Sequence, residues 1–227
     1  MLNVKEIFGP TIQGEGAQAG WPAIFVRFSG CNMWNGAAET KARSMCPYCD
    51  TDFVGGREMT VDEVVMAVHN LIPEHLRNGK GSYLVVLTGG EPLLQPPADL
   101  MHLSRTLQQM GHKTQIETNG ATYNEAVQSI NYVTVSPKVP MKRIKLPWFY
   151  VDTLKLLYPH PTVDYREFLS LMTEAQRPRE FYIQPIDEGR VPPDGSAANV
   201  RAAVALVKEL GYPWRLSLQT HKLINEQ

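Results

Sequence analysis

Short apolar runs alternate along this chain with segments whose apolar residues recur at helical spacing. Runs of branched and aromatic residues are typical of buried strands, and apolar spacings of three and four are typical of helices. The predicted strands are residues 23–29, 83–87, 113–117, 132–135, 153–157, 181–184 and 214–218. The predicted helices are residues 60–71, 100–110, 165–175 and 196–210, with a short helix at best at 122–129.

Strands that alternate with helices predict a parallel sheet that carries its helices outside. We therefore expect an α/β fold in which residues 1–227 form a single domain, an incomplete TIM-like barrel of about six strands. Thr60 and Glu63 form a capping box at the start of the first helix. Polar residues directly follow the strands, and we expect them to meet because parallel strands of a barrel end on one rim.

The three cysteines of the chain, Cys31, Cys46 and Cys49, lie in one stretch directly after the first predicted strand. Clustered cysteines in a reducing compartment are more often metal ligands or catalytic groups than disulfide partners. A closed zinc site needs four protein ligands, whereas three cysteines on a four-iron cluster leave one iron open to a ligand. Zinc with a fourth ligand such as Asp50 or His221 remains the alternative.

Composition narrows the possible functions. A 43% hydrophobic fraction over 227 residues indicates an ordinary globular protein with a substantial core. The net charge of −1 and the absence of runs of like charge argue against binding to nucleic acid or a membrane surface. The N-terminal residues do not have the layout of a signal peptide, so we expect a cytoplasmic location.

The motifs that follow the strands carry a resemblance to a known family. They are residues 11–16, 22–27, 49–51, 88–92, 117–120, 136–138, 184–187 and 219–222. With these motifs in this order, the chain resembles the radical S-adenosylmethionine (SAM) superfamily, and more narrowly the 7-carboxy-7-deazaguanine synthase family. Two features depart from the family pattern. An insertion at about 32–45 gives a C-x14-C-x2-C spacing, and the chain ends in Gln227 where relatives often end in proline.

The resemblance implies a [4Fe–4S] cluster on the three cysteines, with SAM bound to the open iron. The residues that would contact SAM are Tyr48, Cys49, Asp50, Gly90, Glu91, Ser136, Pro137, Lys138, Gln184, Pro185, Ile186 and Asp187. The resemblance also implies Mg2+ at Thr51, where Asp50 would hold one of the waters that this ion usually keeps. Without the resemblance, most of these residues read as ordinary turns and loops.

The implied reaction is a radical-mediated ring contraction of 6-carboxy-5,6,7,8-tetrahydropterin to 7-carboxy-7-deazaguanine, with loss of ammonia, in deazapurine (queuosine-type) biosynthesis. The implied substrate residues are Ile12, Gln13, Gly14, Glu15, Arg27, Thr88, Glu117, Asn119, His221 and Gln227. Arg27 suits the substrate carboxylate because its planar guanidinium forms paired hydrogen bonds. Glu117 suits the N–H donors of the pyrimidine edge. Alternatively, Glu15 and Arg27 pair with one another, and His221 caps a strand end.

The family also implies a homodimer, and a flavodoxin or ferredoxin is the expected electron donor. Two other functions stay open at this point. A radical SAM activase that acts on a protein glycine would show an open surface in place of a closed pocket. A non-catalytic zinc-binding module would hold a metal without any radical chemistry.

Overall fold

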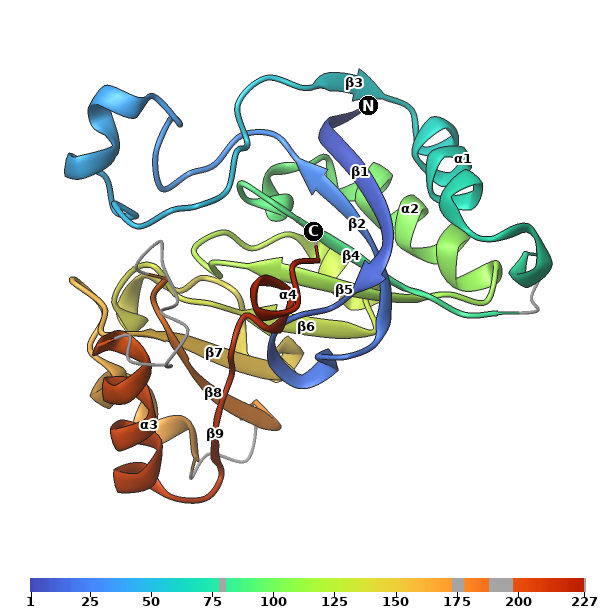
Figure 1. Cartoon of the computed structure of the whole chain (residues 1–227). Helices are drawn as coiled ribbons and strands as arrows, with labels where there is room; N and C mark the ends of the chain where they lie inside the picture. The colour runs from blue at the N-terminus through green and yellow to red at the C-terminus, as the bar shows by residue number, and fades with distance from the viewer. Residues whose placement is uncertain (78–80, 173–177, 188–197, 227) are drawn as a thin grey trace.

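The computed structural model describes residues 1–77, 81–172, 178–187 and 198–226, whose strands form one sheet (Figure 1). The sheet order is β3-β1-β2-β4-β5-β6-β7-β8-β9. From β2 to β9 all neighbours are parallel, whereas β1 pairs antiparallel with both β2 and β3. The strands are β1 (Leu2–Ile12), β2 (Pro22–Phe28), β3 (Arg57–Met59), β4 (Leu84–Gly89), β5 (Lys113–Thr118), β6 (Tyr132–Val135), β7 (Thr153–Tyr158), β8 (Glu180–Pro185) and β9 (Trp214–Leu216).

The parallel strands β2 and β4 to β9 are the seven strands that the apolar runs predict, which confirms the α/β class. β3 and β9 lie at opposite ends of the sheet order, so the described strands form an open barrel. β1 and β3 are not among the predicted strands. Most β1 side chains are only half-buried and most β3 side chains are exposed, so neither strand has a strong apolar pattern.

The helices confirm the prediction in part. The α-helices are α1 (Val61–Leu71), α2 (Pro97–Gln109), α3 (Ala198–Leu210) and α4 (Thr220–Leu223). Short 3₁₀ helices cover Gly16–Gln18, Ala38–Arg43, Glu74–Leu76, Pro92–Leu94, Glu125–Ser129, Met141–Arg143, Trp148–Tyr150 and Tyr165–Met172. The prediction for 165–175 is therefore met by a 3₁₀ helix as far as Met172, and residues 173–175, like 196 and 197, lie outside the described residues.

The capping box at the start of α1 is confirmed. The Thr60 hydroxyl accepts a hydrogen bond from the backbone N of Glu63 at 3.2 Å, and the Thr60 backbone N donates to the Glu63 carboxylate at 2.6 Å. Together these bonds satisfy two backbone donors that the first turn of a helix would otherwise leave without partners.

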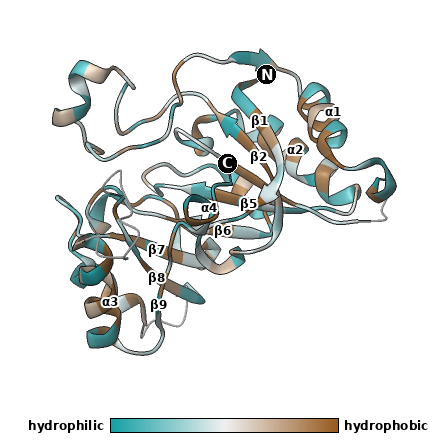
Figure 2. Cartoon of the chain, viewed as in Figure 1, coloured by the Kyte–Doolittle hydropathy of each residue, from teal (hydrophilic) through white to brown (hydrophobic). Residues whose placement is uncertain are grey.

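The α-helices α1, α2 and α3 cover the outer face of the sheet. α1 and α2 lie side by side, α1 against β1 and α2 against β5. Their apolar residues form one cluster with those of β2 and β4, and Figure 2 shows hydrophobic ribbon in this region. α3 packs on β8 and β9 in a second cluster that includes Phe181, Leu206 and Trp214. The inner face of the sheet instead buries polar side chains, among them Gln115, Lys155 and Gln184. Because successive strand residues point to opposite faces, the same strands supply both the core and this polar interior.

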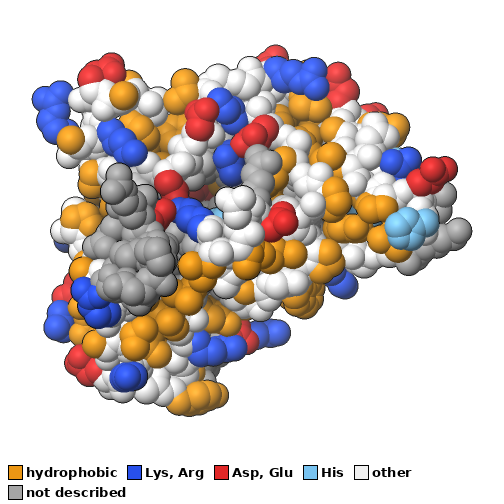
Figure 3. Space-filling view, in the orientation of Figure 1, with side chains coloured by type: hydrophobic (Ala, Val, Ile, Leu, Met, Phe, Trp, Pro, Cys, Tyr) orange, Lys and Arg blue, Asp and Glu red, His pale blue; other side chains and the backbone are white. Residues whose placement is uncertain are grey.

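The insertion at 32–45 stands away from the sheet in Figure 1 and contains the 3₁₀ helix Ala38–Arg43. Basic and acidic side chains are interspersed over the face drawn in Figure 3, in keeping with the net charge of −1. Within the described parts of the chain, the helices are all too short or too polar to cross a lipid bilayer.

Candidate active site

A pocket opens where the parallel strands end, between the inner face of the sheet and the cysteine segment. The predicted site residues that line it are Glu15, Cys31, Cys46, Tyr48, Cys49, Asp50, Thr51, Thr88, Gly90, Glu117, Asn119, Ser136, Lys138, Gln184, Pro185, Ile186 and Asp187. Ile12, Gln13, Gly14, Arg27, Glu91, Pro137 and His221 are not part of this lining. Gln227 lies outside the described residues. The expected convergence of strand ends therefore brings most of the predicted residues together.

The three cysteines face this pocket together despite the long insertion between the first two. Cys46 and Cys49 are joined by a turn in which the backbone N of Cys49 donates to the carbonyl of Cys46 at 3.0 Å. Burial raises the pKa of Cys31, and it raises that of Cys46 to about 11. Without a metal these two sulfurs are therefore thiols near neutral pH, and iron would have to displace their protons.

Gly90 fixes how the loop after β4 meets the cysteine segment. A Cβ atom at position 90 would lie 1.9 Å from the carbonyl oxygen of Gly30 and 3.1 Å from Cβ of Cys31. The backbone N of Glu91 donates to that same carbonyl at 2.9 Å. The glycine is thus required by close packing of two loops, which holds Cys31 at the pocket.

The three cysteine sulfurs face one cavity, as the predicted cluster requires. Among the described residues, no group of three or more His, Cys, Asp or Glu side chains is arranged to hold one metal ion. In a four-iron cluster each cysteine binds a separate iron, so the sulfurs need only face a common cavity. Of the two fourth ligands suggested for zinc, His221 does not line the pocket and Asp50 is paired with Lys222.

Lys138 places a half-buried amine beside the cysteines. Its Nζ donates to the Ser136 hydroxyl at 2.7 Å and to the Ser136 carbonyl at 2.9 Å. Burial lowers the pKa of Lys138, although the nearby Cys46 opposes this shift. An amine held there can donate a hydrogen bond or supply positive charge to a ligand in the pocket.

The Glu91 carboxylate is held by hydrogen bonds within the protein. Its side chain is fully buried, and the carboxylate accepts hydrogen bonds from Thr118 Oγ1 at 2.7 Å, from Asn119 N at 2.8 Å and from Leu93 N at 3.0 Å. Burial raises the pKa of Glu91, and these hydrogen bonds oppose the rise. The side chain therefore joins the loops after β4 and β5, and its contact with a SAM amino group stays a prediction.

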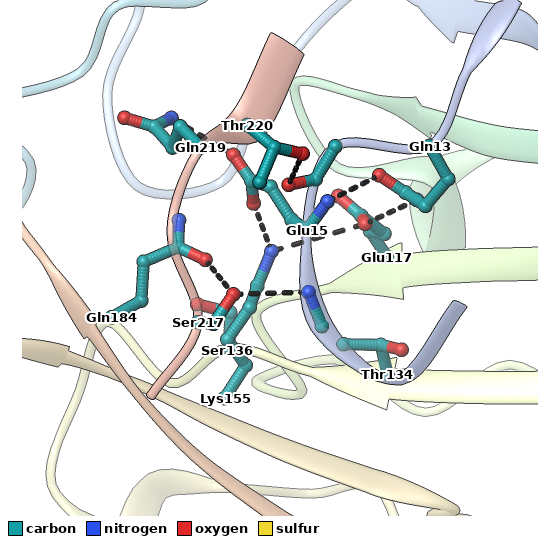
Figure 4. A network of polar contacts seen from close by, with 12 residues as sticks. Gln13, Glu15, Glu117, Thr134, Ser136, Lys155, Gln184, Ser217, Gln219 and Thr220 are labelled. Atoms are coloured by element: carbon teal, nitrogen blue, oxygen red, sulfur yellow. Dashed lines mark hydrogen bonds and ion pairs between the residues drawn. The ribbon is translucent and has the colours of Figure 1, made fainter. Parts of the chain in front are cut away.

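A buried lysine joins two of the predicted carboxylates (Figure 4). Lys155 Nζ forms an ion pair with Glu15 Oε2 and lies 3.8 Å from Glu117 Oε1. Gln13 Nε2 also donates to Glu117 Oε1 at 3.2 Å, and Gln219 Nε2 donates to Glu15 Oε1 at 2.8 Å. The alternative pairing of Glu15 with Arg27 is therefore wrong.

Arg27 contacts β1 and not the pocket lining. Its Nη1 lies 2.7 Å from Glu6 Oε1, and its guanidinium carbon lies 5.3 Å from the centre of the Phe8 ring. The Arg27 Nε is buried and has no hydrogen-bond partner among the described residues. A buried guanidinium donor without a partner is costly, and it leaves a binding capacity that an oxyanion could satisfy.

The C-terminal segment covers the loop after β1. The backbone N and the hydroxyl of Thr220 both donate to the Gly14 carbonyl, at 3.0 and 2.9 Å. His221 lies so close that a Cβ at Gly14 would be 2.1 Å from its Nδ1. His221 therefore packs on the Gly14 loop in α4 and does not cap a strand end. Gln13 lies behind the pocket, where it supports Glu117.

Asp50 and Asp187 are tied together by a lysine. Lys222 Nζ lies 2.6 Å from Asp50 Oδ2 and also pairs with Asp187 Oδ2. This contact links the end of the cysteine segment to the loop after β8 and to α4. If Asp50 holds a water of the predicted Mg2+, its carboxylate has to bind that water and Lys222 at the same time.

Comparison with known proteins decides the family. The model of the radical SAM superfamily matches residues 42–178. The 7-carboxy-7-deazaguanine synthase of Burkholderia multivorans is 36% identical over 98% of this chain and 97% of its own length. The enzyme of the same name from Caulobacter vibrioides is 38% identical with the same coverage. This chain belongs to the 7-carboxy-7-deazaguanine synthase family of the radical SAM superfamily. Its membership confirms the resemblance inferred from the sequence.

A solved structure shows that the synthase fold extends over the whole chain. The crystal structure of QueE from Escherichia coli aligns with a TM-score of 0.65 and 24% identity, over 96% of this chain and 93% of that chain. Membership in the radical SAM superfamily implies a [4Fe–4S] cluster and SAM. The shared cavity of the three cysteines fits that cluster.

The structure adds residues to this synthase site to which the sequence assigned no role. They are Met33, Trp34, Phe53, Lys155, Leu157 and Gln219 in the pocket lining, and Lys222 behind it. For Lys155 a signal existed, because a lysine inside the apolar strand run T-L-K-L-L-Y predicts a buried charge that needs partners. Trp34 lies between Cys31 and Cys46 in sequence and Phe53 follows Cys49, and neither belongs to a motif; their ring centroids are 5.5 Å apart.

Proposed function

We propose that this chain catalyses the radical-mediated ring contraction of 6-carboxy-5,6,7,8-tetrahydropterin to 7-carboxy-7-deazaguanine, with loss of ammonia, in deazapurine (queuosine-type) biosynthesis. The observation that carries the proposal is a single pocket that contains the three cysteines together with Glu117 and Asn119. The relatives that match nearly the full chain are named for this product.

The cysteine side of the pocket would hold the cluster and SAM. When bound and reduced, they supply a carbon radical that abstracts hydrogen from the substrate and later returns it. Lys138 and the end of β8 lie at the pocket wall, where they can donate to the polar groups of SAM. The protein's own contribution is to position these groups and to exclude water.

The inner-face side would hold the substrate. Glu117 accepts hydrogen bonds, so it suits the N–H donors of the 2-amino-4-oxopyrimidine edge. A hydrogen bond from Asn119 Nδ2 to Asn32 Oδ1, 2.7 Å long, orients the Asn119 side chain. Asn32 is the residue after Cys31. Thr88 pairs with Arg27 in the β2–β4 register, so both residues lie on the same row of the inner face. A turn of Arg27 away from Glu6 would bring its guanidinium to the substrate carboxylate.

A Mg2+ ion at Thr51 belongs to the same proposal. Thr51 lines the pocket two residues after Cys49, so an ion held by its hydroxyl would lie inside the pocket. Mg2+ usually keeps several waters and takes few protein ligands, which suits a single hydroxyl. The homodimer and a flavodoxin or ferredoxin as electron donor stay predictions.

Anaerobic reconstitution followed by turnover tests the proposed function. Protein loaded with iron and sulfide, then given SAM, a reductant and the carboxy-tetrahydropterin, should release a product whose mass is lower by one ammonia. SAM cleavage without this product would contradict the substrate and favour an activase. Bound zinc with no iron after careful reconstitution would contradict radical chemistry altogether.

Arg27→Ala tests the substrate side separately. The variant should bind the cluster and SAM normally while its affinity for the substrate falls by roughly tenfold or more, because a charged hydrogen bond is lost. Arg105→Ala, which removes an exposed arginine from α2, is the matched control. Equal substrate affinity in the two variants would remove Arg27 from the site.

A further inference from the structure

Lys155 is a buried charge at the centre of the substrate side of the pocket. Its side chain is only 5% exposed and lies on β7 between the buried residues Leu154 and Leu156. An ammonium group removed from water is strongly destabilising unless partners satisfy it. The partners are Glu15 and Glu117, which come from the loop after β1 and from β5.

Both carboxylate oxygens of Glu15 already have partners within the protein. Lys155 and Gln219 hold its two carboxylate oxygens, and the side chain is 14% exposed. Burial alone would raise the pKa of Glu15, but the charge of Lys155 and the hydrogen bonds lower it to about 2. Glu15 and Lys155 therefore form a neutral pair, and Glu15 has little capacity left for a substrate.

Glu117 keeps an unbalanced negative charge. Gln13, Gln115 and Lys155 all contact its Oε1, at 3.2, 3.5 and 3.8 Å. Among the described residues these are its polar contacts, so Oε2 is the oxygen that remains for a ligand. Two carboxylates share one ammonium, and the excess charge resides on the more exposed Glu117.

We propose that Lys155 is a positioning residue that keeps Glu117 ionised and fixed, so that the pocket selects a heterocycle edge with adjacent N–H donors over one with a carbonyl at the same place. The inference rests on the proposed function and deepens it. A carboxylate accepts hydrogen bonds and donates none, so it attracts a 2-amino group and repels a 2-oxo group. A pocket built for a hydrogen bond rejects analogues that cannot make it.

Removal of Lys155 would weaken the preference for a 2-amino group, because it would favour protonation of one of the two carboxylates. Without the ammonium, Glu15 and Glu117 would be like charges in one largely buried site, which favours the uptake of one proton by the pair. A protonated carboxyl can donate to a carbonyl, so a 2-oxo ligand would become acceptable. The other charged groups near this site are Asp50, which raises the pKa of Lys155 further, and Lys138 across the pocket.

Ligand binding tests the proposal without turnover. The probes are the fluorescent compounds pterin-6-carboxylate, which has a 2-amino group, and lumazine-6-carboxylate, which has a 2-oxo group and an N1–H in its place. The cluster-loaded wild type should bind the pterin roughly 10- to 100-fold more tightly, as expected for one hydrogen bond to a charged acceptor. In Lys155→Met this ratio should fall by roughly tenfold or more, and it should rise again with pH as the shared proton is lost.

Three further variants define the outcome. Lys155→Arg, which keeps the charge, should restore most of the ratio. The double variant Lys155→Met with Glu15→Gln leaves Glu117 as the single carboxylate of the pair, so it should again bind the pterin more tightly than the lumazine. This variant keeps the test informative if Lys155→Met folds poorly. Lys113→Met removes an exposed lysine from β5 and should leave the ratio unchanged.

The result that overturns the proposal is an unchanged pterin preference in Lys155→Met, or a loss of preference that neither Lys155→Arg nor the double variant restores. Wild-type protein that binds both probes equally would overturn it as well. A wild type that prefers the pterin but forms no product would contradict the proposed function alone, because the probes do not require turnover.

Discussion

Glu91→Gln separates two roles for the carboxylate that follows the glycine pair. The structure gives it an architectural role, with three hydrogen bonds that join the loops after β4 and β5. The sequence motif suggested a direct contact with SAM. Glutamine has nearly the same shape, so the substitution removes the charge and one acceptor and leaves the volume unchanged.

The expected loss of stability follows from these contacts. The glutamine amide cannot accept from both the Asn119 backbone N and the Thr118 hydroxyl, so one buried donor loses its partner, which costs about 1–3 kcal/mol. The remaining bonds change from charged to neutral acceptors and weaken. The neutral side chain also avoids the desolvation that raises the pKa of Glu91, which offsets part of the loss. We therefore expect Glu91→Gln to lower the free energy of unfolding by about 2–4 kcal/mol.

Urea unfolding of the metal-free protein, followed by circular dichroism, measures this quantity. Each kcal/mol corresponds to a shift in melting temperature of about 2–4 °C in a chain of this size. Glu209→Gln, an exposed position on α3, is the matched control and should change stability by less than about 0.5 kcal/mol. Calorimetric titration with SAM on the cluster-loaded protein supplies the second readout.

The two roles predict opposite patterns. If Glu91 has the architectural role, Glu91→Gln should lose much of its stability before any cofactor is added. Any change in its SAM affinity should then result from disorder of the two loops. Direct contact predicts normal stability of the metal-free protein and a specific loss of SAM affinity. A Glu91→Gln protein as stable as the Glu209→Gln control would refute the architectural role.

Three other outcomes follow from the structure. Cys46→Ala should abolish cluster assembly, measured as iron and sulfide content, and a variant that still cleaves SAM would show that Cys46 is not a ligand. Thr60→Ala should lower the free energy of unfolding by about 1 kcal/mol through loss of the helix cap, which a thermal melt would detect. The pKa of Glu15 is lowered to about 2 in the folded protein, so its stabilising contribution is complete above about pH 4.5 and is lost as the pH falls toward about 2. Over that range the wild type should lose on the order of 2–3 kcal/mol more than Glu15→Gln, and parallel curves would contradict the ion pair with Lys155.

The parallel strands and the order of the site motifs could be predicted from the sequence because both depend on short-range patterns. Fully apolar runs such as residues 83–87 identify strands buried on both faces. The cysteines and the polar residues after each strand reach one pocket because parallel strands end on the same side. β1 was missed because most of its side chains are only half-buried, which leaves no clear periodicity.

The sequence by itself determined the fold class, the family and the residue types available for chemistry. The tertiary structure alone decided which charges meet: Glu15 pairs with Lys155 and not Arg27, and Glu91 turns into the protein. Glu15 and Lys155 are 140 residues apart in the chain. Their contact depends on sheet order, on the face to which each side chain points and on how the C-terminal segment folds back over the loop after β1. These are long-range properties, so no local pattern of residues encodes them.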